Sequence, residues 1–263
     1  MDEPQQLVKA RPGGWLPDDA TVIAGWIGRL KAMARERALP IVAPIADFRD
    51  MVYNDPGLYS QADRMFADAY AKAPTTPLGQ PSLQSFEEFI DLLNLIMQMA
   101  PEAYQDVNTQ QPAGLIGFPI NALLDWPMAT EAGYNFFSNA LVNQQFKKIL
   151  AYWAQFLTSE ASRYVLTQAE TPISPETVAV PWLGAEAQKE MTGVATHALG
   201  YGPNPTPFAF DQIFNCNPGA PYYGFASWDD FFTRTFRSGV RPVSFPQDDS
   251  VVINACESAP LQV

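Results

Sequence analysis

The stretch that indicates the fold most directly is APYYGFASWDDFFTRTFR, residues 220–237 of a 263-residue chain. Ser227 is a favourable N-cap, and Asp229 and Asp230 follow it in the first turn, where the helix dipole favours negative charge. Aromatic side chains recur at spacings of three and four residues, as on one apolar helix face: Phe225, Trp228, Phe231, Phe232 and Phe236. The stretch therefore predicts one short amphipathic helix.

This helix is expected near residues 227–236 and carries two cations close to its end. Arg234 and Arg237 fall late in the helix, where positive charge is favoured. We therefore expect both arginines at the rim of a helix that packs on a sheet. A β-like run follows at residues 251–253, and it predicts a strand.

Upstream of this stretch, helical periodicity dominates the sequence. Pro44 fits the first turn of a helix, and Ser85 with Glu88 forms a capping-box pattern. Helices are expected after Asp19 and over the ranges 44–52, 58–71, 86–100, 120–126, 128–139, 141–157 and 182–191. Turns, loops or connectors are expected where Pro, Gly, Thr, Ser or Asn cluster, over 54–57, 73–81, 110–119, 167–181 and 200–207.

The composition predicts a compact protein and disfavours several partners. Hydrophobic residues make up 47% of the chain and charged residues only 17%, so a sizeable core is expected. A net charge of −12 disfavours nucleic acid and anionic membrane surfaces. The most apolar stretch, residues 89–100, is too short and too polar to cross a bilayer, and no signal peptide is visible. We expect no membrane anchor and a cytoplasmic location.

Residues that could carry catalysis or bind metal are sparse. His197 is the single histidine; a solvated loop position is the simpler interpretation, and a catalytic base is the alternative. Cys216 and Cys256 lie in no zinc-binding pattern, so we expect two reduced thiols and no metal site. One disulfide in a secreted chain is the alternative. The sequence has no H-E-x-x-H, G-x-S-x-G, P-loop or G-x-G-x-x-G motif.

Residues 220–237 and the residues that follow them resemble the phosphatidylserine decarboxylase family. The resemblance is carried by the Phe-Phe-x-Arg core at 231–234, by Arg241-Pro242 and by Ala-Cys-Glu-Ser at 255–258. Together with APYYGF at 220–225, the last motif looks like the branch that includes fungal L-tryptophan decarboxylases. Weaker similarities extend over nearly the whole chain, at 14–16, 44–48, 146–148 and 182–183.

The resemblance implies a pyruvoyl-dependent decarboxylase. In this family a serine in a Gly-Ser context becomes the pyruvoyl cofactor by self-cleavage, assisted by an acid and a histidine. Glu257 matches the acid, where many relatives have aspartate; without the family, a surface carboxylate would be the simpler interpretation. The chain has no Gly-Ser pair, and His197 precedes Glu257, whereas the family histidine follows the acid. The resemblance thus implies that the pyruvoyl group cannot form from these 263 residues alone.

The pattern and the resemblance together predict a mainly α fold. We expect a helical N-terminal domain over residues 1–200 and a linker over 201–221. Residues 222–263 are expected to be the incomplete start of an α+β decarboxylase catalytic domain.

Two functions from different classes fit these observations. The first is the N-terminal part of an enzyme that, when complete, decarboxylates an aromatic amino acid such as L-tryptophan. Its partners would be the amino acid and a complementing C-terminal catalytic segment, and the isolated chain is expected to be inactive. The alternative is a stand-alone helical binding or regulatory module without catalysis.

Overall fold

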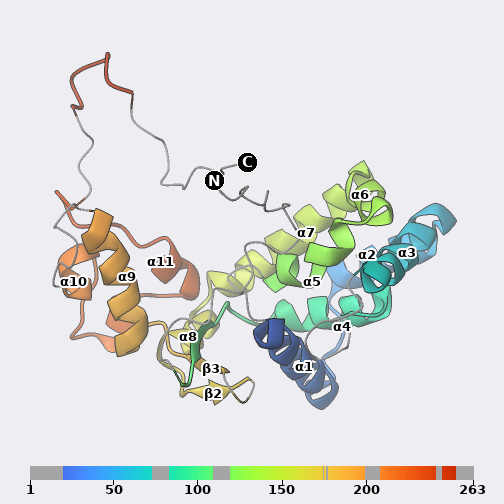
Figure 1. The fold of residues 1–263 in the computed structure, drawn as a ribbon, viewed down its shortest axis with the longest axis horizontal. Coiled ribbons are helices and arrows are strands. Elements are labelled where there is room, and N and C mark those ends of the chain that lie inside the picture. The colour runs from blue at the N-terminus through green and yellow to red at the C-terminus, as the bar shows by residue number, and fades with distance from the viewer. Residues whose placement is uncertain are drawn as a thin grey trace, which may run out of the picture.

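The structure is a computed structural model that describes residues 20–72, 83–108, 119–173, 175, 177–198, 208–240 and 245–252. Within these ranges α-helices dominate, and a small antiparallel sheet accompanies them (Figure 1). The predicted mainly α fold is therefore confirmed.

The helices up to residue 157 surround a common core, and we call this part the helical lobe. Its largest fully buried aromatic side chains are Phe48, Phe66, Phe89 and Phe136. Phe48 packs edge to face on Phe136, with ring centroids 6.2 Å apart. The lobe consists of α1 (Ala20–Arg37), α2 (Ala43–Tyr53), α3 (Pro56–Lys72), α4 (Phe86–Ile96), α5 (Pro119–Met128), α6 (Glu131–Phe137) and α7 (Ala140–Leu157).

Helix α4 is the central element of the helical lobe and contacts α1, α2, α3 and α5. Its N-terminus is capped as predicted: the Ser85 hydroxyl accepts a hydrogen bond from the Glu88 amide at 3.2 Å. The Glu88 carboxylate in turn accepts from the Gln84 amide at 2.9 Å. These bonds satisfy amide groups that have no partner inside the helix.

Helix α3 begins two residues before the start that the sequence predicted, because Asp55 caps it. The Asp55 carboxylate accepts hydrogen bonds from the Gly57 amide at 2.9 Å and the Leu58 amide at 3.1 Å. Pro56 then occupies the first helical position, where its missing N–H costs nothing. The turn expected at 54–57 is thus shorter than predicted.

The expected connector over 167–181 is partly wrong, because it contains two strands. β3 (Thr177–Val180) pairs antiparallel with β1 (Ala103–Asp106), and β2 (Thr171–Pro172) pairs with the other side of β3. All four residues of β3 are buried. A strand this short, buried throughout, shows no alternation of apolar and polar residues that a sequence pattern could reveal.

The remaining elements form a second cluster, which we call the aromatic lobe. It is built from η1 (Glu160–Arg163), α8 (Tyr164–Thr167), α9 (Ala185–Ala198), α10 (Phe210–Ile213), η2 (Pro221–Gly224) and α11 (Trp228–Phe232). Its buried centre contains Val165, Leu166, Phe210, Ile213, Phe214, Phe225, Trp228 and Phe231. Helix α7 runs from the helical lobe toward this cluster (Figure 1).

The two lobes meet at the segment 99–104, which we call the junction. The indole of Trp153 donates a hydrogen bond to the Met99 carbonyl at 2.9 Å, and the indole of Trp182 donates to the Pro101 carbonyl at 2.8 Å. Glu102, only 2% exposed, accepts two hydrogen bonds from the Arg29 guanidinium, at 2.6 and 3.1 Å. The Tyr104 hydroxyl donates to the same carboxylate at 3.0 Å.

The predicted domain boundaries stay a prediction, but the structure describes part of the region. Within the expected linker over 201–221, α10 is helical and belongs to the aromatic lobe, while residues 201–207 lie outside the described residues. Of the strand expected at 251–253, Val251 and Val252 are irregular and exposed, and Ile253 lies outside the described residues. None of the described helices is long and apolar enough to span a membrane.

Candidate functional site

Residues 220–237, which carry the resemblance, contain the capped helix α11, which is hydrogen-bonded to another element of the aromatic lobe. The Ser227 hydroxyl accepts a hydrogen bond from the Asp230 amide at 3.0 Å, and the Asp230 carboxylate accepts from the Ala226 amide at 2.9 Å. The Trp228 amide donates to the Ser162 hydroxyl at 2.9 Å. The predicted cap is confirmed, and the hydrogen bond of the Trp228 amide to Ser162 connects α11 to η1.

The helix is shorter than predicted, so its last aromatic residue and its arginines follow it. α11 ends at Phe232, and Phe236 forms an isolated β-bridge with Phe214. Phe232 and Phe236 are 55% and 40% exposed, so only the first part of the predicted apolar face is buried. The expectation of arginines at the end of the helix is therefore corrected.

Arg234 lies in an aromatic cage instead of at a solvated rim. Its guanidinium carbon is 4.4 Å from the ring centre of Phe214, 4.7 Å from that of Phe231 and 5.8 Å from that of Phe210. It donates to the Phe231 carbonyl at 3.0 Å and approaches the Met191 sulfur at 3.2 Å. Such cation–π contacts hold a guanidinium without a carboxylate.

Burial of Arg234 has an electrostatic consequence. Desolvation lowers the pKa of its guanidinium to about 10. Its Nε atom is buried and has no hydrogen-bond partner among the residues that the structure describes. A cation with this incomplete set of partners costs stability, which is typical of a group kept for a positioning or binding role.

Tyr222 and Tyr223 stand next to each other in the left-handed conformation, with φ values of 53° and 55°. Each such non-glycine residue costs roughly 1–3 kcal/mol unless its surroundings impose it. Here the Tyr223 carbonyl accepts from the Asn217 amide at 2.9 Å, and the Tyr223 hydroxyl accepts from the Gln188 amide group at 3.1 Å. The Arg163 guanidinium stacks on the Tyr222 ring at 4.5 Å. A strained pair held from several sides indicates a functional constraint on this loop.

A family model for phosphatidylserine decarboxylase matches residues 42–191, which run from the start of α2 into α9. The chain belongs to the phosphatidylserine decarboxylase family. Members of this family depend on a pyruvoyl group. The match covers most of the helical lobe but, of the aromatic lobe, only η1, α8 and part of α9.

Relatives with curated names extend the match over most of the chain. An L-tryptophan decarboxylase of Psilocybe cubensis and one of Psilocybe cyanescens are each 30% identical to it over 252 residues, which is 93% of this chain and 50% of each relative. The decarboxylase iboD of Amanita muscaria (strain Koide BX008) is 31% identical over 158 residues, 60% of this chain and 39% of the relative. The chain thus spans about half the length of the L-tryptophan decarboxylases it matches.

The residues that the sequence marked for chemistry lie mostly outside the described part. Glu257, with the rest of the motif at 255–258, lies outside the described residues, and so does the side chain of His197. Cys216 is a free, half-buried thiol, and burial raises the pKa of this thiol, so it is neutral near pH 7. Among the described residues, no group of three or more His, Cys, Asp or Glu side chains could hold a metal ion.

The pair that the resemblance implies for the pyruvoyl precursor is Gly-Ser, and the 263 residues contain none. The aromatic lobe offers ring faces, a caged guanidinium and capped amides. These groups can position a loop or a substrate but supply neither a nucleophile nor an acid–base pair.

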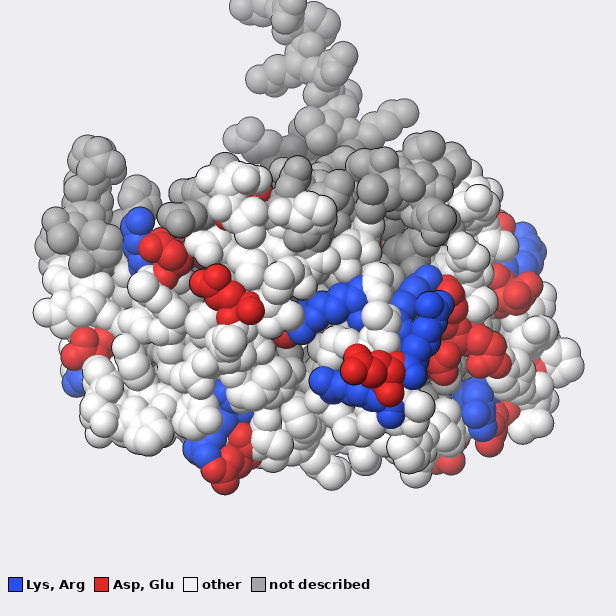
Figure 2. Space-filling view, turned by 90° about the horizontal axis from the view of Figure 1, so that it is seen from below, with Lys and Arg blue, Asp and Glu red and all other residues white. Residues whose placement is uncertain are grey.

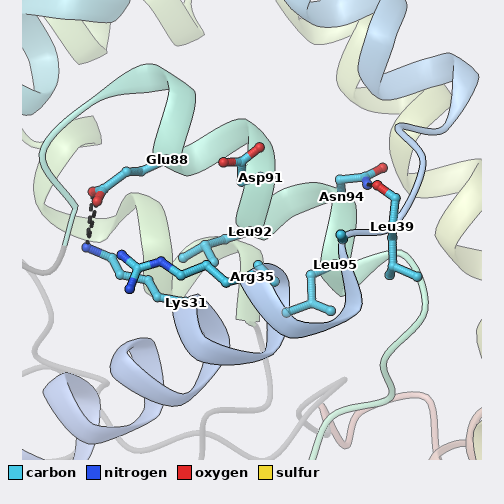
Figure 3. A pocket seen from close by; sticks show the side chains of 10 residues that line it. Lys31, Arg35, Leu39, Glu88, Asp91, Leu92, Asn94 and Leu95 are labelled. Atoms are coloured by element: carbon cyan, nitrogen blue, oxygen red, sulfur yellow. Dashed lines mark hydrogen bonds and ion pairs between the residues drawn. The ribbon is translucent and has the colours of Figure 1, made fainter.

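A pocket that the sequence did not predict lies between α1 and α4 (Figure 3). Its volume is about 220 Å³. The ion pair of Lys31 with Glu88 closes one end, and Leu39 and Asn94 lie at the other. Asn94 is buried and clamps the α1–α2 connection: its side-chain oxygen accepts from the Val42 amide at 2.9 Å. The residues that line the pocket come from two segments that are far apart in the sequence, so no local motif could indicate the pocket.

Proposed function

We propose that the complete protein decarboxylates an aromatic amino acid, with L-tryptophan as the first candidate substrate. The observation that carries this proposal is the 30% identity to two L-tryptophan decarboxylases over 93% of the chain. The family alone would equally allow a phospholipid substrate. The net charge of −12 favours a small amino acid, because it opposes docking on anionic lipid.

Within this proposal, Glu257 is the acid that assists self-cleavage to the pyruvoyl group. Its support is the match of residues 255–258 to the family motif. The serine and the histidine would come from a complementing C-terminal segment. In support, the chain spans only 50% of each L-tryptophan decarboxylase it matches, which leaves room for such a segment. The isolated chain is then inactive, and a cytoplasmic location belongs to the same proposal.

The described residues would act by positioning. The caged Arg234 and the strained tyrosines hold the loop that leads from α10 to α11, just upstream of Glu257 in the sequence. Because a displacement of about 1 Å can cost two orders of magnitude in rate, a rigid support of this kind is functional without touching substrate.

A substrate competition tests the proposal. The protein produced from its complete reading frame is incubated with L-tryptophan, L-phenylalanine or phosphatidylserine vesicles, and the amine product is quantified by mass spectrometry. Tryptamine formation in clear preference to phosphatidylethanolamine is the expected result. Turnover of phosphatidylserine alone would replace the substrate assignment, and no turnover of any substrate would contradict the enzymatic function.

A further inference from the structure

The pocket between α1 and α4 carries a balanced set of charges in a strongly acidic protein. Two cations, Lys31 and Arg35, face two anions, Glu88 and Asp91, around an apolar lining. That lining is formed by Ala34, Ala38, Leu39, Leu92 and Leu95. Figure 2 shows the face of the molecule on which α1 lies. Basic and acidic side chains cluster there, while much of the surrounding surface is uncharged.

One cation and one anion of the pocket are already satisfied by each other. The Lys31 ammonium lies 3.0 and 3.1 Å from the two carboxylate oxygens of Glu88. Arg35 and Asp91, in contrast, have no hydrogen-bond or ion-pair partner among the residues that the structure describes. The pocket therefore presents one available positive and one available negative group.

A positive charge at Arg35 is accounted for by its position in the last turn of α1, because cations are favoured at helix C-termini. That position gives no reason for a carboxylate on a second helix, beside the same cavity, that has no partner among the described residues. Asp91 comes from α4, and partial desolvation of its carboxylate together with the nearby carboxylates of Glu87 and Glu88 raises its pKa. A cationic group of a ligand would relieve this repulsion.

Size and charge together narrow the ligand. A volume of about 220 Å³ is below the ~300–1,000 Å³ of sites for drug-sized molecules. A phosphate or another dianion would be repelled by the carboxylates of Glu88 and Asp91, and a diamine would be repelled by Lys31 and Arg35. A small molecule with one charge of each sign and an apolar body matches all parts of the lining.

We propose that this pocket binds a free zwitterionic α-amino acid. Its carboxylate would bind Arg35, its ammonium group would bind Asp91, and its side chain would lie against Leu39 and Leu92. The zwitterion follows from the pocket itself, whereas the choice of an aromatic side chain rests on the proposed function. This binding requires no catalytic step.

The test compares ligands that lack one charge each. The purified protein is titrated calorimetrically with L-tryptophan, with tryptamine, which lacks the carboxylate, and with indole-3-propionate, which lacks the amine. L-tryptophan is expected to bind about tenfold more tightly than either analogue, because each analogue loses one charge-assisted contact. Equal affinity for all three, or no binding of any amino acid, overturns the proposal.

Two variants assign the charges. Arg35→Gln is expected to weaken binding of L-tryptophan about tenfold and to leave binding of tryptamine unchanged. Asp91→Asn should also weaken binding of L-tryptophan about tenfold but leave binding of indole-3-propionate unchanged. The exposed Lys148 and Asp63 lie outside the pocket lining, so Lys148→Gln and Asp63→Asn are matched controls. Because all four positions are exposed, the variants should fold, which thermal unfolding verifies. Unchanged binding in both pocket variants contradicts the assignment.

A third ligand separates this inference from the proposed function. If L-leucine binds and L-tryptophan does not, the zwitterion site stands and the aromatic preference is wrong. If L-tryptophan binds with the expected charge pattern but the complete protein does not decarboxylate it, the binding site stands and the proposed activity fails. If the complete protein decarboxylates L-tryptophan but no binding depends on Arg35 and Asp91, the proposed activity stands and the binding site is wrong.

Discussion

Among the glycines that the structure describes, Gly133 has the least room for a Cβ atom. A Cβ atom there would lie 2.0 Å from the Pro127 carbonyl oxygen and 3.0 Å from the Met128 Cα, both of which are backbone atoms. We therefore expect Gly133→Ala to lower the free energy of unfolding by about 2–4 kcal/mol. In Gly28→Ala, on α1, the new methyl group meets no atom within 4 Å, so a gain of about 0.5–1 kcal/mol is expected. Urea unfolding measures both, and a neutral Gly133→Ala would refute the close packing of α5 on α6.

Asp91 should make stability depend on pH. Partial desolvation and the carboxylates of Glu87 and Glu88 raise its pKa in the folded state, although Lys31 and Arg35 line the same pocket from α1. The folded protein then binds the proton more readily than the unfolded chain, so ionised Asp91 costs stability that is regained as pH falls through the folded pKa. Asp91→Asn should raise the melting temperature at pH 7, and the difference should shrink on acidification toward pH ~4. A lower melting temperature for the variant at pH 7 would contradict this sign.

At the residue scale, the sequence predicted caps better than side-chain surroundings. Ser85 and Ser227 were correctly expected to cap helices, because a cap depends on residues within one turn. The cage around Arg234 draws its rings from α10, from Phe214 directly after it and from α11, and the left-handed tyrosines depend on Asn217 and on residues of other elements. Such surroundings exist only after folding, so no local pattern could indicate them.

At the scale of elements, the pair of Arg29 with Glu102 connects α1 to the junction. Because Glu102 is 2% exposed, removing one partner leaves a buried charge, and we expect Arg29→Met to cost about 3–5 kcal/mol. The double variant Arg29→Met with Glu102→Leu should recover much of this loss. Asp50→Asn, which breaks the exposed pair with Arg49, is the control and should change stability far less than Arg29→Met. Equal effects in the two single variants would show that the buried pair is no stronger than the surface pair.

Helices of the helical lobe could be predicted from periodicity, whereas the sheet could not. α1, α2, α4 and α7 each repeat apolar residues over three turns or more. Their predicted positions agree with the structure, except that α4 ends at Ile96 and not at residue 100. The strands are two to four residues long, and β3 finds its partner β1 far away in the chain. Pairing at that distance leaves no mark in a local window.

For the whole molecule, the junction decides whether the lobes unfold together. Met99, Ala100 and Ala103 belong to the cores of the helical lobe, the aromatic lobe and the sheet, respectively. We therefore expect one cooperative unfolding transition when tryptophan fluorescence and far-ultraviolet circular dichroism are compared. Trp182→Phe removes the hydrogen bond to the Pro101 carbonyl and should separate the two probes. Two transitions in the unchanged protein would show that the lobes are independent.

The central proposal is that this chain is part of a pyruvoyl-dependent decarboxylase, and one intact-mass measurement tests it most directly. The protein is produced from its complete reading frame, and the masses of its polypeptides are determined with and without the substitution Glu257→Ala. The account predicts two polypeptides for the unchanged protein, one of them with a pyruvoyl N-terminus, and a single uncleaved polypeptide for Glu257→Ala. A single uncleaved polypeptide in both cases would contradict the account.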